Sequence, residues 1–262
     1  MNLDSLLDHL VRACLDVFGA ERVEGIVLHG SALKGGGIPG YSDVDFMVFL
    51  APVCFDESGT LLDHLVFAIQ ERIGPLPWRE AGFLYPQAYF YDARRLPDWW
   101  TGPIPGAHRV LWGRLPPEVV PTAEGLRADS LRFLKHVLPQ YIARDLGGFA
   151  DADDASLPRR VRLLGTRVMP AILALLGHDA GDPLALWALP KFEALRLLEE
   201  RYPDDEGPRL ARRFFEDVRR LYGGAFDADL GRRTFRTGIA FLRWAELVAR
   251  SLAEPPDGAG AR

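Results

Sequence analysis

The chain has 262 residues, of which 48% are hydrophobic, 11% aromatic and 26% charged, and this composition excludes a chain that is disordered throughout. The formal net charge of −5 argues against an extended nucleic-acid-binding surface. Two cysteines, Cys14 and Cys54, cannot build a disulfide framework or a four-cysteine zinc site, so we expect a cytoplasmic protein. Its apolar stretches are shorter than the roughly twenty residues of a membrane helix, so we expect no membrane partner.

The first half of the chain predicts a small sheet with flanking helices. Apolar residues recur at helical spacing from Leu3 to Phe18, which indicates an amphipathic helix. Further patterns predict strands at Gly25–His29, Asp43–Leu50 and Phe83–Tyr91, a helix at Leu61–Ile73, and a short strand or turn at Val110–Gly113. The excess of acidic residues also lies in this half.

The second half predicts helices alone, and it is rich in arginine. We expect Thr122 to cap a helix that Pro139 bends or ends, and Ser156 to cap a long helix to Leu176. A short helix is expected to start at Asp182-Pro183, and further helices at 190–202, 208–221 and 229–253, with a frayed tail from 254 to 262. The sequence thus predicts an α+β protein, with a mixed-sheet domain at 1–118 and a helical bundle at 119–262.

Asp43 and Asp45 open the second apolar strand. Side chains two residues apart on a strand point to the same face, so we expect the two carboxylates to converge. Two like charges at the edge of a core repel each other unless a cation binds them. Oxygen donors of this kind suit Mg²⁺, and we expect Asp43 and Asp45 to be both metal ligands and catalytic residues.

Gly30 and Ser31 follow the first strand, and a glycine-rich segment from 35 to 40 comes next. A glycine at a strand end lets a phosphate approach the backbone, and amide groups and a hydroxyl can hold its oxygens. A metal ion beside phosphates indicates a nucleoside triphosphate site. We expect His29 to be a hydrogen-bonded structural histidine and Lys34 to be exposed to solvent.

These motifs resemble those of the DNA polymerase β-like nucleotidyltransferases, and most of all the aminoglycoside nucleotidyltransferases that modify streptomycin, spectinomycin or kanamycin. The resemblance rests on Gly30-Ser31-Ala32, on the glycines before Pro39, and on Ser42-Asp43-Val44-Asp45. In the helical half, Pro190-Lys191-Phe192-Glu193-Ala194 is similar to a motif whose lysine reaches the triphosphate. The resemblance implies nucleotide binding by Gly30, Ser31, Ser42 and Lys191, with Mg²⁺ as the cofactor.

One position departs from the family pattern. The family carries a third carboxylate on the third core strand, and Gln87 stands at that position here. An amide brings no charge and cannot accept a proton at neutral pH. Other acids remain open as the general base: Asp92, Asp151, Asp153, Asp154, Asp182 and Glu193.

The resemblance implies transfer of a nucleoside monophosphate, AMP from ATP, to a hydroxyl of a small aminoglycoside-like acceptor, with release of pyrophosphate. Such an activity would confer antibiotic resistance. Because Gln87 replaces a carboxylate, a catalytically weak nucleotide-binding or regulatory protein on the same scaffold is the alternative. The sequence leaves the acceptor, the nucleobase and the oligomeric state open.

Overall fold

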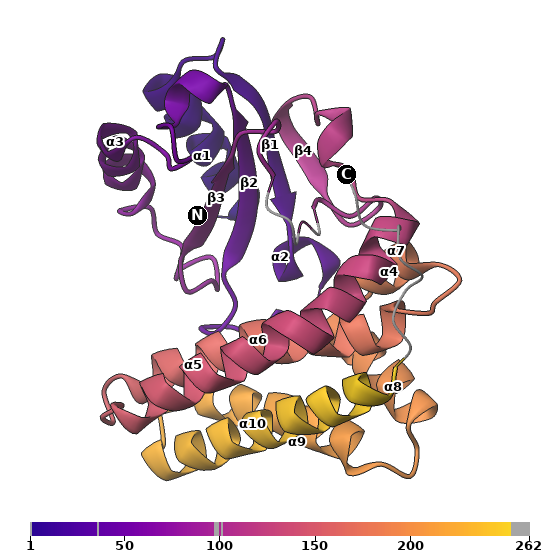
Figure 1. The fold of residues 1–262 in the computed structure, drawn as a ribbon. Helices are drawn as coiled ribbons and strands as arrows, with labels where there is room; N and C mark the ends of the chain where they lie inside the picture. Colours follow the sequence, from indigo (N-terminus) through magenta and orange to yellow (C-terminus); the bar gives the residue numbers. More distant parts are fainter. Residues whose placement is uncertain (1, 36, 97–99, 101, 253–262) are drawn as a thin grey trace. The chain divides into compact units, whose positions relative to one another are not determined.

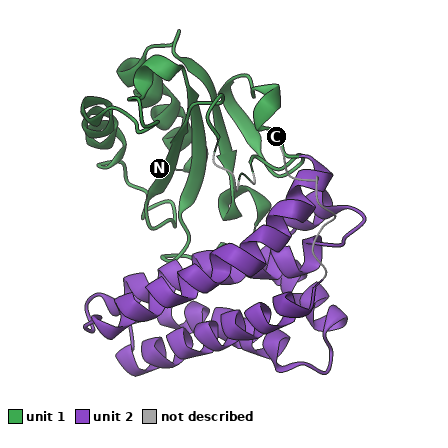
Figure 2. Cartoon of the chain, viewed as in Figure 1, with its two compact units in different colours: residues 1–121 green, residues 122–262 purple. Residues whose placement is uncertain are grey.

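The computed structural model describes residues 2–35, 37–96, 100 and 102–252. The chain forms two compact units, residues 1–121 and 122–262 (Figure 2), where the sequence predicts a boundary after residue 118. The structure confirms the predicted α+β class, with a mixed sheet in unit 1 and helices in unit 2. Within the described ranges, no helix is both long and apolar enough to cross a lipid bilayer.

Unit 1 is built on a four-stranded sheet (Figure 1). Its elements are α1 (Leu3–Phe18), β1 (Val23–His29), α2 (Ser31–Lys34), β2 (Val44–Leu50), η1 (Pro52–Cys54), α3 (Asp63–Ile73), β3 (Pro86–Tyr91), β4 (Arg109–Gly113) and η2 (Pro117–Val119). The strand order is β3-β2-β1-β4. Strand β1 pairs antiparallel with β2 and β4, whereas β2 and β3 run parallel.

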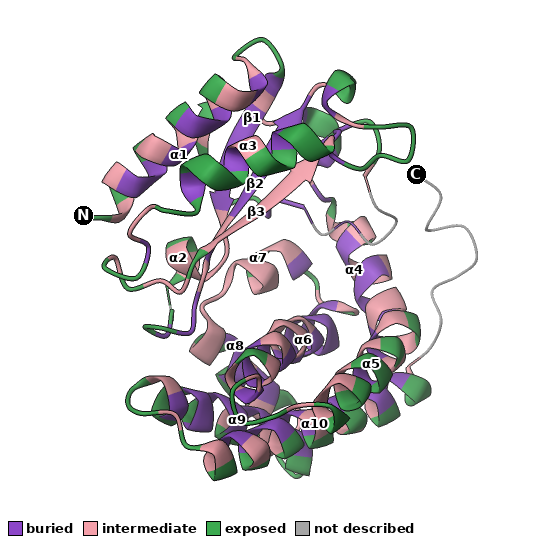
Figure 3. Ribbon diagram, turned by 90° about the vertical axis from the view of Figure 1, so that its left-hand side faces the viewer, coloured by how far each residue is buried: buried purple, intermediate pink, exposed green. Residues whose placement is uncertain are grey.

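The two faces of this sheet have different cores. Alternate residues of the central strands, among them Ile26, Phe46 and Val48, pack with α1 and α3 in one core. The residues between them, such as Val27, Met47 and Phe49, form a second core with Trp100 and Val119. Figure 3 shows buried residues along β1 and β2, whereas β3 is only partly buried along its length.

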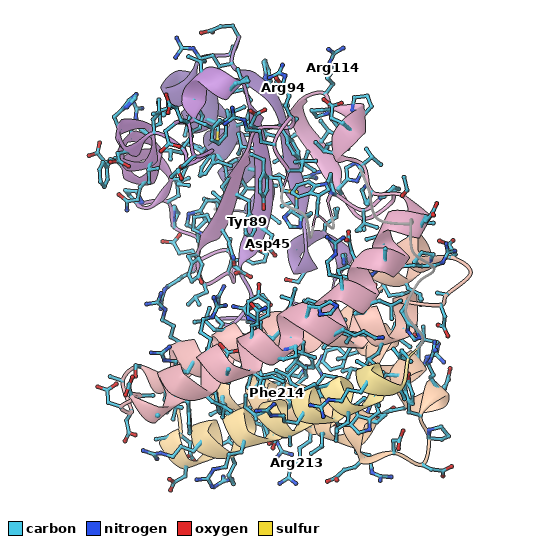
Figure 4. The ribbon with its side chains drawn as sticks, in the orientation of Figure 1. Asp45, Tyr89, Arg94, Arg114, Arg213 and Phe214 are labelled. Carbon is cyan, nitrogen blue, oxygen red and sulfur yellow. The ribbon has the colours of Figure 1, made fainter. Side chains whose placement is uncertain are left out.

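Unit 2 is a helical bundle. Its elements are α4 (Ala123–Arg132), a π-helical turn η3 (Phe133–Val137), α5 (Leu138–Ala150), α6 (Leu157–Gly177), α7 (Pro183–Ala188), α8 (Lys191–Arg201), α9 (Glu206–Tyr222) and α10 (Ala228–Ser251). Phe214 is fully buried among these helices, whereas Arg213 beside it points away from them (Figure 4). The predicted tail 254–262 lies outside the described residues.

Two local expectations for unit 2 concern helix ends. Pro139 does not end the helix after Thr122: a π-helical turn joins α4 to α5, and Pro139 lies in the first turn of α5, where its missing N–H is tolerated. The alternative that Pro139 bends the helix stays a prediction. The amide of Ser156 donates a hydrogen bond to the Asp153 carboxylate at 2.8 Å, so the capping side chain is Asp153 rather than Ser156. The predicted Thr122 cap is confirmed, since its hydroxyl accepts a hydrogen bond from the Gly125 amide at 3.0 Å.

The crossing of α10 with α6 and α9 requires a glycine. A Cβ atom on Gly238 would lie 2.6 Å from Leu164 Cδ2 and 2.9 Å from Phe214 Cδ2. We expect Gly238→Ala to lower the free energy of unfolding by about 1–3 kcal/mol, the usual result of overpacking a core. Urea denaturation followed by circular dichroism would measure this change.

Gly147→Ala is the matched control, because among the described residues nothing lies within 4 Å of a Cβ at that helical position. The control should be as stable as the unchanged protein or more stable, by up to about 1 kcal/mol, since alanine favours helix more than glycine does. Equal stability of the two variants would contradict the assigned packing of α10.

Candidate functional site

A row of polar residues crosses the second face of the sheet near its end. Asp45 is the second residue of β2, and its cross-strand partners are His29 on β1 and Gln87 on β3. Residues directly opposite each other on paired strands point to the same face. Figure 4 shows Asp45 and Tyr89 near each other at this end of the sheet, while Arg94 and Arg114 lie toward the other end.

The backbone of Gly30 lies close to the Asp45 side chain of this row. Its φ is +77°, a conformation that favours glycine. A Cβ atom on Gly30 would lie 2.2 Å from Asp45 Oδ2. The Asp45 carboxylate therefore packs directly against the turn that links β1 to α2, as a site combining a metal ion with phosphate requires.

Ser42 stabilises the end of the glycine-rich segment that follows α2 through two hydrogen bonds to the backbone of Ile38. Its hydroxyl accepts a hydrogen bond from the Ile38 amide at 2.8 Å, and its own amide donates to the Ile38 carbonyl at 2.9 Å. The Ser42 side chain is buried, which gives it a structural part in shaping the loop. The predicted contact between Ser42 and a nucleotide stays a prediction.

Asp43 immediately precedes β2. Backbone pairing with the neighbouring chain continues through it, because Leu84 donates to the Ser42 carbonyl at 2.8 Å and Val44 donates to the Tyr85 carbonyl at 3.2 Å. The chain is therefore extended at Asp43, and alternation assigns Asp43 to the same face as Asp45. Their joint binding of a metal ion remains a prediction.

Lys34 adds a positive charge that the sequence analysis missed. It is the last residue of α2 and is partly buried, contrary to the expected exposure. Burial lowers the pKa of Lys34 to about 8, while the negative charge of Asp45 opposes this shift. The ammonium group therefore stays largely protonated at neutral pH, within electrostatic reach of Asp45. Its place three residues after Ser31, in a chain with only three lysines, was the available signal.

His29 also differs from its expected role. Its Nε2 atom is buried and makes no hydrogen bond to any described residue, so it is not a satisfied structural histidine. Burial lowers the pKa of His29 to about 3, with smaller contributions from the positive charges of Lys34 and His108. The imidazole is therefore neutral at physiological pH.

Gln87 is held by its neighbour two residues along β3. Its Nε2 donates a hydrogen bond to the Tyr89 hydroxyl oxygen. The Tyr89 ring centroid lies 6.0 Å from that of His29 and 6.3 Å from that of Tyr91. The position next to Asp45 is therefore an oriented amide rather than a carboxylate.

Most of the acids that the sequence left open as a general base have local structural partners. Asp92 accepts a hydrogen bond from the Arg94 amide at 2.9 Å. The other partners are Ser156 for Asp153, Arg232 for Asp154, the Ala185 amide for Asp182, and Arg196 for Glu193. Asp151 is exposed at the end of α5. These contacts favour structural roles for the five partnered acids.

Lys191 is the first residue of α8 in unit 2. Its Nζ lies 4.7 Å from the centroid of the Phe215 ring, a distance at which the cation is attracted to the aromatic face. The following residue, Phe192, packs under the Arg219 guanidinium, whose Cζ lies 3.7 Å from the centroid of the Phe192 ring. These contacts fix the start of α8, and a contact between Lys191 and phosphate stays a prediction.

The donor set near Asp45 fits a hard divalent cation only if a substrate completes the coordination. Among the described residues, no three His, Cys, Asp or Glu side chains are grouped so as to hold a metal ion. Mg²⁺ typically binds through one or two carboxylates together with water and substrate phosphates. Asp45 fits that pattern, because it carries an oxygen donor directly beside the backbone turn at Gly30.

No protein-family model and no curated protein matches the sequence. Among solved structures, the fold is similar to the crystal structure of spectinomycin adenyltransferase AAD(9) from Enterococcus faecialis with ATP and spectinomycin, at a TM-score of 0.55 and 13% identity. The match covers 92% of this chain and 100% of that chain. The expected resemblance to a nucleotidyltransferase is therefore confirmed at the level of the fold.

The contact between Gly30 and Asp45 can be tested with two glycines of similar conformation. Gly30 and Gly35 have φ values of +77° and +81°, but among the described residues nothing lies within 4 Å of a Cβ on Gly35. Gly35→Ala should therefore add only backbone strain, of about 1–3 kcal/mol. Gly30→Ala should add the same strain and also displace the Asp45 carboxylate.

We expect both variants to melt at a lower temperature, with the larger loss for Gly30→Ala. The sequence predicts that Mg²⁺-ATP binds here, and a bound ligand stabilises a protein by about 2.7 kcal/mol when its concentration is 100 times Kd. We expect only Gly30→Ala to lose this predicted stabilisation. Thermal unfolding with and without Mg²⁺-ATP measures both effects. An unchanged ligand response in Gly30→Ala would show that Asp45 does not depend on this glycine.

Proposed function

We propose that this chain is a metal-dependent nucleotidyltransferase that transfers a nucleoside monophosphate to a hydroxyl of a small acceptor, with AMP from ATP and an aminoglycoside-like acceptor as the first pair to test. The observation that carries the proposal is the packing of the Asp45 carboxylate against Gly30, at the start of α2. The fold shared with an adenyltransferase supports it, because that enzyme was crystallised with ATP and spectinomycin.

Each residue has a proposed task. The carboxylates of Asp43 and Asp45 hold Mg²⁺, and the ion when bound neutralises charge on the attacked phosphate and the leaving pyrophosphate. Gly30 lets the triphosphate approach the backbone, while the Ser31 amide and hydroxyl donate hydrogen bonds to phosphate oxygens. Ser42 holds the loop that flanks them. Lys34 and Lys191 contribute positive charge toward the triphosphate.

Chemically, the acceptor oxygen forms a bond to the α-phosphorus, and the bond from that phosphorus to the oxygen of the leaving pyrophosphate breaks. Because the hydroxyl loses its proton in this step, a proton acceptor is needed. The Gln87 amide cannot fill that role. We therefore assign Gln87 to binding, through the amide orientation that Tyr89 fixes.

The direct test is pyrophosphate release from Mg²⁺-ATP in the presence of spectinomycin, streptomycin or kanamycin. Asp43→Asn and Asp45→Asn should each lower kcat by about 100-fold or more, since charge stabilisation of this kind is typically worth ~10²–10³ in kcat. Asp16→Asn is the control, because that side chain on α1 is 63% exposed. Undiminished release in both site variants would exclude these carboxylates from the reaction.

Gln87 supports a second candidate, a nucleotide-binding protein with weak catalysis, because an amide stands beside Asp45. Gln87→Glu distinguishes the two. If Gln87 belongs to an active catalytic site, the variant should lose activity, by about tenfold, because a third negative charge beside Asp43 and Asp45 disturbs the bound state. The measurement is again pyrophosphate release.

A tenfold gain in Gln87→Glu would instead favour the weak-catalysis alternative. Gln70→Glu on α3 is the matched control, because Gln70 is exposed on the helix that packs on the opposite face of the sheet. It should leave pyrophosphate release unchanged.

A further inference from the structure

The Nε2 atom of His29 is a buried polar atom that makes no hydrogen bond to any residue the structure describes. Buried polar atoms in folded proteins are almost always satisfied, because leaving one unpaired destabilises the fold. A buried imidazole nitrogen that is retained without a protein partner therefore indicates a ligand. The position of the ring shows which kind of ligand it can meet.

The rings of His29 and Tyr89 approach each other across the strand that carries Asp45. His29 is the last residue of β1, and its cross-strand partner on β2 is Asp45. The ring centroid lies 6.0 Å from that of Tyr89 on β3, which is the strand on the far side of β2. The imidazole therefore lies on the same face of the sheet as the Asp45 carboxylate, where Gln87 flanks Asp45 from β3.

We propose that His29 binds the divalent ion together with Asp45, and that this makes the site selective for a first-row transition ion such as Mn²⁺ over Mg²⁺. The inference rests on the proposed function of Asp45 as a metal ligand and does not use Asp43, because the described residues contain no group of three His, Cys, Asp or Glu side chains that could hold an ion. His29 contributes a neutral nitrogen donor, Asp45 a carboxylate oxygen and Gln87 an amide position, so the donor set spans three adjacent strands.

The chemistry of these donors gives the selectivity. Mg²⁺ prefers oxygen ligands at near-ideal octahedral geometry, whereas imidazole suits transition metal ions. Affinity for a given nitrogen and oxygen site rises from Mn²⁺ through Co²⁺ along the first row. An amide in place of a carboxylate reduces the negative charge that would favour Mg²⁺. A nitrogen ligand from His29 shifts the balance further toward transition ions.

The experiment removes metals from the full chain and then titrates Mn²⁺ in the presence of inorganic triphosphate, which completes the coordination and carries no nitrogen, with electron paramagnetic resonance as the readout. Electron spin echo modulation from ¹⁴N reports an imidazole nitrogen bound to Mn²⁺, independently of any activity. We expect this modulation in the unchanged protein and its loss in His29→Gln, with Mn²⁺ binding weakened about tenfold or more and Mg²⁺ binding weakened less. Asp45→Asn should also weaken Mn²⁺ binding.

His108→Gln is the matched control, because His108 precedes β4 and its Nδ1 lies 2.8 Å from the Ile104 carbonyl oxygen. It should keep the nitrogen signal. His29→Leu separates loss of the ligand from loss of the fold. It removes the unsatisfied Nε2 atom, so without metal it should unfold at a temperature no lower than that of the unchanged protein. It should still lose the nitrogen signal.

Three results would overturn the assignment of His29: no Mn²⁺ binding, Mn²⁺ bound without nitrogen modulation, or a modulation that persists in His29→Gln. Equal affinities for Mn²⁺ and Mg²⁺ would overturn the selectivity. Stabilisation by Mg²⁺-ATP and pyrophosphate release are measured alongside. If stabilisation and pyrophosphate release persist while the nitrogen signal is absent, the proposed function stands and His29 is not a ligand. If stabilisation, pyrophosphate release and the nitrogen signal are all absent, the proposed function fails too.

Discussion

The candidate site depends on one close approach, in which the Asp45 carboxylate lies against the Cα atom of Gly30. Only a residue without a Cβ can occupy that position, because a Cβ would lie 2.2 Å from Asp45 Oδ2. The antiparallel pairing of β1 with β2 sets the distance, since it places the end of one strand beside the start of the other. The turn into α2 and the first carboxylate of β2 are consequently neighbours, although fourteen residues lie between Gly30 and Asp45 in the sequence.

Lys34 and Asp45 carry opposite charges at this end of the sheet. Burial lowers the pKa of Lys34 only to about 8, because the negative charge of Asp45 opposes the shift, so Lys34 stays positively charged at neutral pH. His29 is neutral because burial lowers its pKa to about 3. On the other side stands an amide, Gln87, oriented by Tyr89. The site therefore combines one strand carboxylate with neutral donors and a nearby cation, and this combination underlies both the proposed nucleotide chemistry and the proposed selectivity for the metal ion.

Much of the fold could be predicted because the pattern in the sequence is local. Helix α1 runs from Leu3 to Phe18 as its apolar spacing indicates, and the alternation of β2 separates the residues of the two cores. The effect of Pro139 stayed open in the sequence because a proline that ends one helix and a proline in the first turn of the next have the same sequence signature. The sequence predicted Ser156 as the capping side chain of α6, whereas the structure shows Asp153 in that role, because serine and aspartate are both good capping residues.

The sequence by itself determined the α+β class, the order of the elements, and the motif of Gly30, Ser31, Asp43 and Asp45, because these follow from periodicity and from residue chemistry over short spans. Only the tertiary structure decided that Gln87 is the neighbour of Asp45 on β3, that Lys34 is partly buried, and that the Nε2 atom of His29 lacks a hydrogen bond to the described residues. Strand register and burial arise from contacts between segments distant in the chain. The packing of the whole unit therefore sets the charge state and hydrogen bonding of each side chain, which its own local sequence cannot specify.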